Sequence, residues 1–452
     1  MRNIFKKLSQ SLPKNERSNK VLVNVVLLFF LKGWSGVIQF LLVPLTLLCL
    51  DEYEYGIWLL VNSILVWIDS FDIGLGNGLR NKIAEYIAKD KLHAARQAVS
   101  TTFAMLILII IPISILLFVL VDHLDLYTLL NVDHSRIGDL VGIIQVSIGL
   151  ICGTFILKFI GNVYLGHQRP AVNTLLVVGG QTLSMLIIAI LPYLFQKVSL
   201  MHVAIAYTAA PLLIYVVAYP ITFYRVYPRL KPSFFLFQKS MISELMGLGV
   251  KFFVLQLSGM ILFTTSNLLI SNLFGPNEVT PYQVVYKYFS FILMLVSIVI
   301  TPIWSATTDA YVRGDMQWIR NLTHRMMKIL FSFTALVILL GVISPWIYPY
   351  WTLGKVDVPE SMTILMGIYI VVIMFSLYFA NILYGTGKIF VQMVTTLIEA
   401  IMFIPLAILG SKMYGLNGII IALILSNLPC AITNIVQYNK IITGKARGLW
   451  SK

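Results

Sequence analysis

The chain has 452 residues, of which 58% are hydrophobic and only 12% are charged, and its mean hydropathy is +0.87. Because a typical soluble domain is about 45–50% apolar and about 25% charged, this composition excludes a soluble enzyme, a disordered protein and a disulfide scaffold. The net charge of +14 would fit nucleic-acid binding, but the positions of the charges along the chain indicate a different origin, which is described below.

Twelve apolar segments follow one another along the chain, and each is close to or longer than the roughly 20 residues that a membrane-spanning helix needs. They must be helices, because open strands cannot satisfy their backbone groups in lipid and barrel strands are shorter and alternate in polarity. The sequence therefore predicts an all-α integral membrane protein with about 12 transmembrane helices. The predicted spans are residues 22–48, 55–79, 99–121, 139–165, 172–194, 201–224, 247–273, 281–308, 328–349, 361–384, 390–410 and 415–438.

Lysine and arginine gather on one side of these spans. If the N-terminus lies in the cytoplasm, the loops on the opposite side hold only Arg136, Lys197, Lys355 and Lys412. The positive-inside rule therefore predicts that both termini are cytoplasmic. The excess of positive charge is a topology signal, and no nucleic-acid partner is needed to explain it.

A polar stretch at 225–246 divides the chain into two lobes. We predict an N-lobe at 1–224 with helices 1–6, a cytoplasmic linker at 225–246 and a C-lobe at 247–452 with helices 7–12. The lobes resemble weak repeats, because Tyr86 and Tyr311 lie in similar polar segments 225 residues apart. Six spans in each lobe give both halves the same membrane orientation, with substrate held between them.

Enzyme signatures are missing from the sequence. The glycines of the run Gly74-Leu75-Gly76-Asn77-Gly78 have the wrong spacing for a dinucleotide loop and end a membrane helix instead of a strand. There is no P-loop lysine motif and no His-Glu-x-x-His, and the three scattered cysteines form no metal-ligand or disulfide pattern. We therefore expect a transporter with no catalytic residue, no metal site and no cofactor beyond a coupling ion.

Ionisable residues inside the predicted spans are the most informative feature, because a charge at the bilayer centre costs about 2.5–3.5 kcal/mol on insertion scales. At about 1.5 Å per residue, Lys32 lies about 15 Å inside its helix, near the midplane, where it cannot easily snorkel to water. Lys251 and Lys287 lie nearer helix ends, where snorkelling is the alternative. The full set is Lys32, Asp69, Asp72, Lys158, Lys251, Lys287 and Glu399.

The lysines of this set outnumber the acids, and Arg80 lies at its cytoplasmic edge. Such an interior attracts an anion, and a phosphate or diphosphate suits the compact charge of lysine. Gln39 follows Lys32 by seven residues and shares its helix face. Ser258 has the same spacing from Lys251. We expect Gln39 and Ser258, together with Trp34, to line a cleft between the first and seventh helices.

The acids leave two interpretations open. Asp69 and Asp72 are three residues apart and share a helix face, so they either neutralise Lys32 or Lys158 in a buried pair or take up a proton or sodium ion. Glu399 lies in the middle of its helix without a basic neighbour in the sequence. It is therefore either protonated or an ion-coupling site.

Three stretches resemble bacterial O-antigen and capsule polysaccharide flippases. Residues 72–85, DIGLGNGLRNKIAE, are similar to the end of the second helix in that family. Residues 274–282, FGPNEVTPY, and the stretch from 301 to 311 are similar to its eighth helix. The resemblance covers the whole chain, including its length and helix count.

The flippases belong to the multidrug, oligosaccharidyl-lipid and polysaccharide export superfamily. The resemblance implies a V-shaped, two-lobed bundle that works by alternating access. It also implies translocation of an undecaprenyl-diphosphate-linked oligosaccharide across the bacterial plasma (inner) membrane, for O-antigen, lipopolysaccharide or other surface polysaccharide assembly. The implied drive is a proton or sodium gradient or the membrane potential.

The resemblance also implies partners and a site. The partners are the lipid-linked oligosaccharide, membrane lipids and a polysaccharide polymerase. Basic cavity residues bind the diphosphate in the family, and by type and depth the matching residues here are Lys32, Lys158, Lys251 and Lys287.

A cation-coupled multidrug or toxin exporter of the same fold stays open as the alternative. Such exporters usually carry an acid in the first helix, where this chain has Lys32. A membrane glycosyl- or acyltransferase would need a large acidic or histidine-bearing outer loop, and the predicted outer loops are short. A non-transporting scaffold would leave the buried charges without an explanation.

Overall fold

The computed structural model describes residues 16–70, 75–167, 169–246, 262 and 264–451. These residues are almost entirely helical, and no β-strand is present among them. Ten of the described helical stretches are long and apolar enough to cross a membrane. Helix α3 and a helical segment at 264–274 correspond to the two remaining predicted spans. The prediction of an all-α integral membrane protein is confirmed.

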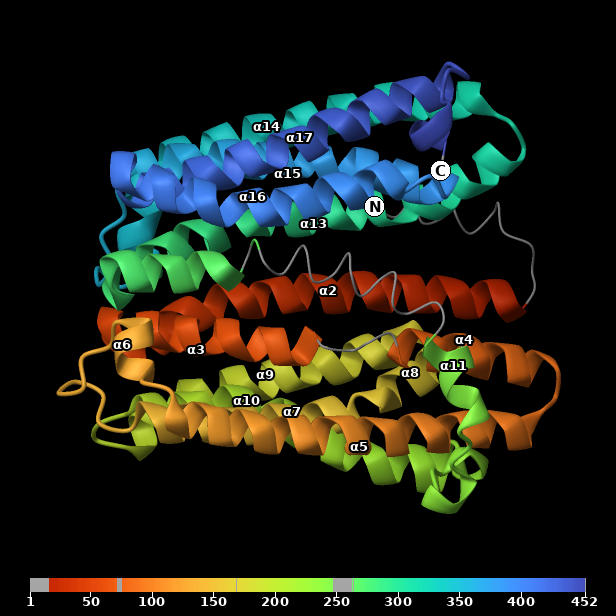
Figure 1. Ribbon diagram of the computed structural model, residues 1–452, viewed down its shortest axis with the longest axis horizontal. Coiled ribbons are helices and arrows are strands. Elements are labelled where there is room, and N and C mark those ends of the chain that lie inside the picture. The colour runs from red at the N-terminus through yellow and green to blue at the C-terminus, as the bar shows by residue number, and fades with distance from the viewer. Residues whose placement is uncertain (1–15, 71–74, 168, 247–261, 263, 452) are drawn as a thin grey trace.

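The helices of the first half form one packed group, which we call the N-terminal bundle (Figure 1). Within it, α9 packs against α2 and α10, and α7 packs against α5 and α10. Its members are α2 Glu16–Cys49, α3 Glu52–Ser70, α4 Leu75–Ala88, α5 Leu92–His123, α6 Leu126–Leu130, α7 Leu140–Leu157, α8 Phe159–Gly166, α9 Pro170–Leu194 and α10 Leu200–Pro220.

The helices of the second half form the C-terminal bundle, which lies alongside the first with its long helices running in the same general direction (Figure 1). In it, α15 packs against α13 and α17, and α16 packs against α17. Helix α13 also contacts α2 and α3, and so joins the two bundles. The members are the segment 264–274, α13 Val279–Val312, α14 Met316–Trp351, α15 Glu360–Thr386, α16 Phe390–Tyr414 and α17 Leu416–Ile442.

Short elements connect and end the bundles. A π-helical turn, η1 Ile221–Val226, continues α10, and the 3-10 turns η2 Pro228–Leu230 and η3 Phe234–Leu236 precede α11 Ser240–Met246. The 3-10 turn η4 Pro276–Glu278 precedes α13, and η5 Gly448–Ser451 ends the described chain.

Several helices differ from the predicted spans. The span expected at 55–79 is described as α3 and α4, with 71–74 outside the described residues. The span expected at 139–165 breaks at Lys158 into α7 and α8. Helix α14 starts at Met316 instead of 328, because Asp315 accepts a hydrogen bond from the backbone N–H of Trp318 over 2.9 Å and caps the helix. Hydropathy marks the bilayer thickness, whereas capping residues decide where a helix begins.

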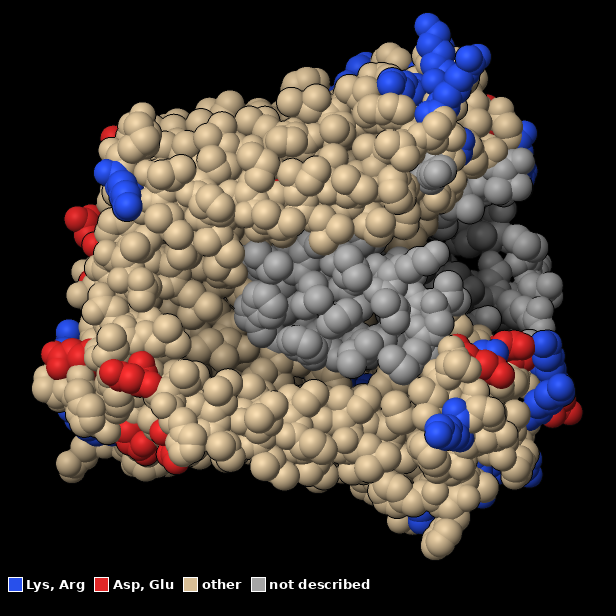
Figure 2. Space-filling view, viewed as in Figure 1, with Lys and Arg blue, Asp and Glu red and all other residues tan. Residues whose placement is uncertain are grey.

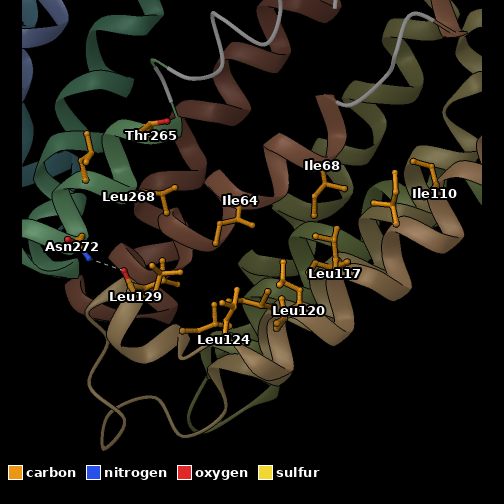
Figure 3. Close-up of a pocket in the computed structure, with 17 residues that line it drawn as sticks. Ile64, Ile68, Ile110, Leu117, Leu120, Leu124, Leu129, Thr265, Leu268 and Asn272 are labelled. Atoms are coloured by element: carbon orange, nitrogen blue, oxygen red, sulfur yellow. Dashed lines mark hydrogen bonds between the residues drawn. The ribbon is translucent and has the colours of Figure 1, made fainter. Parts of the chain in front are cut away.

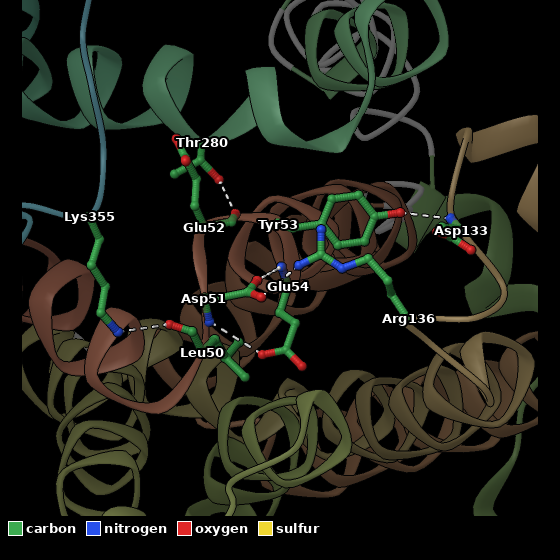
Figure 4. Close-up of polar contacts among 9 residues, drawn as sticks. All are labelled: Leu50, Asp51, Glu52, Tyr53, Glu54, Asp133, Arg136, Thr280 and Lys355. Carbon is green, nitrogen blue, oxygen red and sulfur yellow. Dashed lines mark hydrogen bonds and ion pairs between the residues drawn. The ribbon is translucent and has the colours of Figure 1, made fainter.

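On the face that Figure 2 shows, the charged side chains of the described residues lie mainly at the two ends of the long helices, and the surface between these ends is almost free of charge. We call the end that carries residues 50–54 and 124–139 the acidic end, because Asp51, Glu52, Glu54 and Asp133 gather there (Figure 4). The opposite end, which carries the turns at 89–91 and 313–315, is the basic end. An uncharged belt between two charged ends is the surface expected of a membrane-spanning protein.

Candidate functional site: a lysine-lined cavity between the bundles

A cavity of about 280 Å³ lies between α2 and α13, where the two bundles meet. Its lining residues recur every three or four positions on each helix, so each helix presents one face to it. Two of them, Lys32 and Lys287, carry ammonium groups. Helix α2 supplies Lys32, Ser35, Gly36, Gln39 and Phe40, and α13 supplies Lys287, Ser290, Phe291 and Met294.

Lys287 is held at the junction of the bundles. Its Nζ donates a hydrogen bond to the hydroxyl of Tyr55 on α3 over 2.8 Å, and it lies 5.4 Å from the centre of the Tyr55 ring. Tyr55 is only 1% exposed, so this contact is inside the protein. The contact with Tyr55 favours a role for Lys287 inside the protein over snorkelling.

Neither lysine of the cavity has an acidic partner among the residues that the structure describes. Lys32 is exposed in the space between the bundles, and Lys287 faces the hydroxyl of a tyrosine, which carries no charge to balance it. Two ammonium groups that line one cavity produce a positive potential that favours an anion. The Asp69 side chain and all of Asp72 lie outside the described residues, so their predicted pairing with a lysine stays a prediction.

The two helices approach closely at Gly36. A Cβ atom at this position would collide with the thioether of Met294 on α13. A larger residue at 36 would therefore require the end of the Met294 side chain to move and would change the shape of the cavity. Gln39, one turn beyond Gly36, lines the cavity as expected.

Trp34 points elsewhere. Its indole N–H donates to the hydroxyl of Thr182 on α9 over 3.2 Å, and it does not line the cavity. The neighbouring Ser35 donates to Gln181 on the same helix over 2.6 Å. The expectation that Trp34 lines the cleft is wrong, because α2 presents that residue to its own bundle.

Lys158 belongs to a different site. It lies at the break between α7 and α8 and lines a separate pocket of about 150 Å³ inside the N-terminal bundle, with Gly76, Asn162 and Asn173. Arg80 is exposed on α4 and does not line the cavity. The structure thus brings together Lys32, Gln39 and Lys287, and it does not bring Lys158 or Arg80 to them. Lys251 and Ser258 lie outside the described residues.

Glu399 lies inside the C-terminal bundle, on α16, and is 5% exposed. Its Oε1 has no hydrogen-bond partner among the described residues, and the same holds for the hydroxyls of Tyr369 on α15 and Ser426 on α17. It is therefore a buried carboxyl group that does not line the lysine cavity. The structure leaves both of its predicted roles open.

Hydrogen-bonded side chains, which we call the polar bridge, connect the two bundles near the cavity and were not predicted from the sequence. Asn267 donates to the hydroxyl of Ser63 on α3 over 2.6 Å, and Gln283 on α13 donates to the Asn267 side-chain oxygen over 2.7 Å. Gln283 precedes Lys287 by one helical turn. A signal was available, because amides inside apolar spans that lie one turn from a buried lysine are candidates for the same site.

Further hydrogen bonds join the bundles at the acidic end (Figure 4). The Thr280 hydroxyl donates to the Glu52 carbonyl over 2.8 Å, and Lys355 donates to the Leu50 carbonyl over 3.3 Å. The Ser271 hydroxyl donates to the Leu130 carbonyl over 2.5 Å. The two bundles are therefore tied together on the acidic side of the cavity.

Comparison with known proteins places these features in a family. Residues 21–308 match the family model described as polysaccharide biosynthesis protein. A Salmonella typhi protein named as an O-antigen transporter is 25% identical over 403 residues, which are 86% of this chain and 89% of that protein.

Solved structures of transporters share the fold. An inward-facing conformation of a multidrug resistance MATE family transporter of the MOP superfamily has a TM-score of 0.77 at 17% identity, covering 92% of this chain and 94% of that chain. An outward-facing conformation described in the same words has a TM-score of 0.64 at 16% identity, covering 93% and 96%. A MOP superfamily transporter from Pyrococcus furiosus, whose title describes a binding pocket of reverse polarity, has a TM-score of 0.66 at 16% identity, covering 94% and 96%.

Proposed function

Because this chain belongs to the polysaccharide biosynthesis protein family, we propose that it is a flippase that moves an undecaprenyl-diphosphate-linked oligosaccharide across the bacterial plasma membrane. The chain is a multi-pass membrane protein with the fold of MOP superfamily transporters. Its relatives are named as transporters, which agrees with the prediction that it is not an enzyme. The product of this transport would be a lipid-linked precursor of O-antigen or another surface polysaccharide.

One observation carries the proposal: Lys32 and Lys287 project from facing helices into a single cavity that no described carboxylate neutralises. Two ammonium groups suit the two phosphates of a diphosphate, since lysine acts as a compact point charge toward phosphate oxygens. Gln39 and Ser290 add hydrogen-bonding groups beside them. In this account the cavity recognises the part of the substrate that all lipid diphosphates share.

The proposed cycle is alternating access. In this cycle the predicted lobes, 1–224 and 247–452, rock about the cavity while the segment 225–246 links them. Hydrogen bonds at the acidic end close that side, and the higher TM-score to the inward-facing relative supports an inward-open state. The positive-inside rule places the basic end and both termini in the cytoplasm. The cavity then loads from the cytoplasmic side.

Energy for the cycle would come from a proton or sodium ion. Glu399 is the described candidate, because a buried carboxyl group whose Oε1 lacks a partner gains most from a proton or a cation. It lies within the C-terminal bundle, so its charge would act on the packing of α16 and not on the substrate. Asp69 and Asp72 stay proposed as a second coupling or pairing site, and Lys251 and Ser258 as further cavity residues.

The remaining basic residues would have supporting roles. Arg80, exposed on α4, would attract the anionic substrate from the cytoplasmic side. Lys158 lines its own pocket inside the N-terminal bundle, so a direct contact with the diphosphate in this state is not part of the proposal.

A cation-coupled multidrug exporter is the second candidate, because the MATE transporters share the fold. The charge of the cavity separates the two functions. An exporter of cationic drugs would gain nothing from two lysines in its binding site, since like charges repel by several kcal/mol in a desolvated site.

Translocation in reconstituted vesicles tests the proposal. Vesicles that contain the purified protein receive either a fluorescent lipid-linked oligosaccharide diphosphate or a cationic dye, and transport across the membrane is followed for each. We expect movement of the lipid-linked oligosaccharide only. Movement of the dye without movement of the oligosaccharide lipid would overturn the proposal in favour of the exporter.

A further inference from the structure

A second cavity, of about 570 Å³, lies between the two bundles toward the acidic end (Figure 3). Its walls come from α3, α5, α6 and α7 of the N-terminal bundle and from the segment 264–274 of the C-terminal bundle. The lining is isoleucine, leucine and valine except for Thr265 and Asn272. We call it the apolar groove.

The polar bridge of Ser63, Asn267 and Gln283 adjoins both the apolar groove and the lysine cavity. Ile64 and Leu268 line the groove and are the sequence neighbours of Ser63 and Asn267. On the other side, Gln283 is one turn from Lys287, which lines the lysine cavity. The three hydrogen-bonded side chains therefore connect α3 and the segment 264–274, which line the groove, with α13, which lines the lysine cavity.

We propose that the apolar groove binds the isoprenoid chain of the transported lipid while its phosphate groups occupy the lysine cavity. This inference rests on the function proposed above and adds a site for the second half of the substrate. The pairing of a positive cavity with an aliphatic groove complements an amphiphile that has an anionic head and one long apolar chain. Separation of Asn267 from Ser63 opens the passage between the two sites.

The groove has walls from both bundles, so rocking of the bundles changes its width together with that of the lysine cavity. In this proposal the isoprenoid chain of the lipid therefore moves together with its headgroup and stays bound to the protein during transport. Because lipid tails are as apolar as the groove, the isoprenoid chain gains little hydrophobic free energy when it moves from the bilayer into the groove. Its binding there depends on van der Waals packing and on a defined position. The consequence is selection for a branched isoprenoid by shape.

An internal control exists on the C-terminal bundle. A second apolar cavity, of about 640 Å³, is lined by residues of α13, α14 and α15, among them Phe289, Val337 and Ile338. Its walls come from one bundle only, and none of its lining residues is lysine or arginine. Both cavities are apolar and open to the surface of their bundles, so a groove that is specific for the substrate must bind it in preference to this control cavity.

Photo-cross-linking in vesicles distinguishes specific binding in the apolar groove from general lipid binding in the control cavity. The full chain is reconstituted with a polyprenyl diphosphate that carries a diazirine on its chain, or with phosphatidylglycerol that carries the same group on an acyl chain. We expect the polyprenyl probe to label residues 110–130 in preference to 334–345, and excess unlabelled polyprenyl diphosphate to remove that label. Phosphatidylglycerol should label both regions without such competition. Equal labelling of both regions by the polyprenyl probe would overturn the inference.

Filling the groove with a tryptophan side chain provides a second test. Leu120 lines the apolar groove and is 47% exposed, whereas Ile338 lines the control cavity and is 64% exposed, so tryptophan fits at either position without entering a packed core. We expect Leu120→Trp to reduce specific labelling by the polyprenyl probe about tenfold, equivalent to about 1.4 kcal/mol, and Ile338→Trp to leave it unchanged. Unaltered labelling in Leu120→Trp would contradict the groove.

Failure of the groove and failure of the function give different results. One outcome is that the protein translocates lipid-linked oligosaccharide and needs the two lysines, while the polyprenyl probe labels the control cavity as strongly as the groove. That result would support the flippase function and contradict the proposed role of the groove. If no lipid-linked oligosaccharide moves and the polyprenyl probe shows no competition, the proposed function itself falls.

Discussion

The Nζ of Lys287 on α13 lies 2.8 Å from the hydroxyl of Tyr55 on α3 and donates a hydrogen bond to it, so a cavity lysine also joins the two bundles. An anion that draws this ammonium group into the cavity weakens the contact with Tyr55. Substrate binding and the relative position of the bundles are therefore linked through one side chain. That linkage is what alternating access requires, since a ligand shifts a conformational equilibrium only through different contacts in the two states.

Tyr55→Phe removes the hydrogen-bond acceptor of Lys287 and keeps the ring. A hydrogen bond to a charged group is worth about 1.5–3 kcal/mol, so we expect the closed acidic side to be populated about tenfold less and the translocation rate to fall. Tyr350→Phe, at a ring that is 85% exposed, is the control. The measurement is the translocation rate in vesicles, and a rate equal to the wild type would show that the contact has no role in the cycle.

Gly56→Ala should open the acidic end. A Cβ at Gly56 on α3 would lie 2.9 Å from the carbonyl carbon of Pro276 and collide with its oxygen. Overpacking costs about 1–3 kcal/mol, so we expect a shift toward forms in which the bundles are apart on that side. Spin labels at positions 138 and 413 would report a longer distance. Gly341→Ala, where a Cβ meets no neighbour within 4 Å, should leave the distance unchanged, and an unchanged distance in Gly56→Ala would refute the expectation.

A cross-link between positions 63 and 267 should stop transport. Their side chains are 2.6 Å apart across the two bundles, and a short cleavable thiol reagent can join cysteines placed there in a chain that lacks Cys49, Cys152 and Cys430. We expect translocation to cease and to return after the linker is cleaved. Cysteines at 35 and 181, which join α2 to α9 within one bundle, form the control pair. Full turnover with the 63–267 link in place would rule out relative movement of the bundles.

Glu399→Gln should uncouple transport from the ion gradient. The amide keeps the size of the side chain but cannot take up a proton, and it binds a cation far less well than a carboxylate. We expect substrate binding to persist while the rate no longer responds to an imposed proton or sodium gradient. Glu360→Gln, at the start of α15 and exposed, controls for loss of charge. A gradient response equal to the wild type in Glu399→Gln would remove it from the coupling mechanism.

The sequence was sufficient to predict the all-helical membrane fold, because apolar length and the cost of unpaired backbone groups in lipid allow few alternatives. It was also sufficient to single out Lys32 and Lys287, because a lysine deep in a span is costly without a function. The ends of α14 were not predictable from hydropathy, because Asp315 caps that helix beyond the bilayer. The cavity itself depends on which helix faces which.

Neighbouring helices explain the remaining differences. The spacing of residues along a helix predicts how deep a residue lies and which face it occupies, but not which other helix that face contacts. Lys158 and Trp34 were therefore grouped with Lys32, although they contact other parts of the N-terminal bundle. Tyr55 and Asn267 were not singled out, because tyrosine and asparagine are common in membrane helices and acquire meaning only from their partners. The described residues of the cavity come from the first and eighth helices. The part of the seventh helix that was expected to face it, 247–261, lies outside the described residues.

Binding of a polyprenyl diphosphate to the purified protein tests most directly whether the two lysines form an anion site. The series is the wild type, Lys32→Ala, Lys32→Arg, Lys287→Ala and the exposed control Lys412→Ala, each checked for monodispersity. We predict that each cavity alanine weakens binding by about tenfold to a hundredfold, in line with about 1.5–3 kcal/mol for a hydrogen bond to a charged group. Lys32→Arg should bind at an intermediate level, because it keeps the charge and changes its geometry, and Lys412→Ala should bind as the wild type does. Wild-type affinity in both Lys32→Ala and Lys287→Ala would contradict the account.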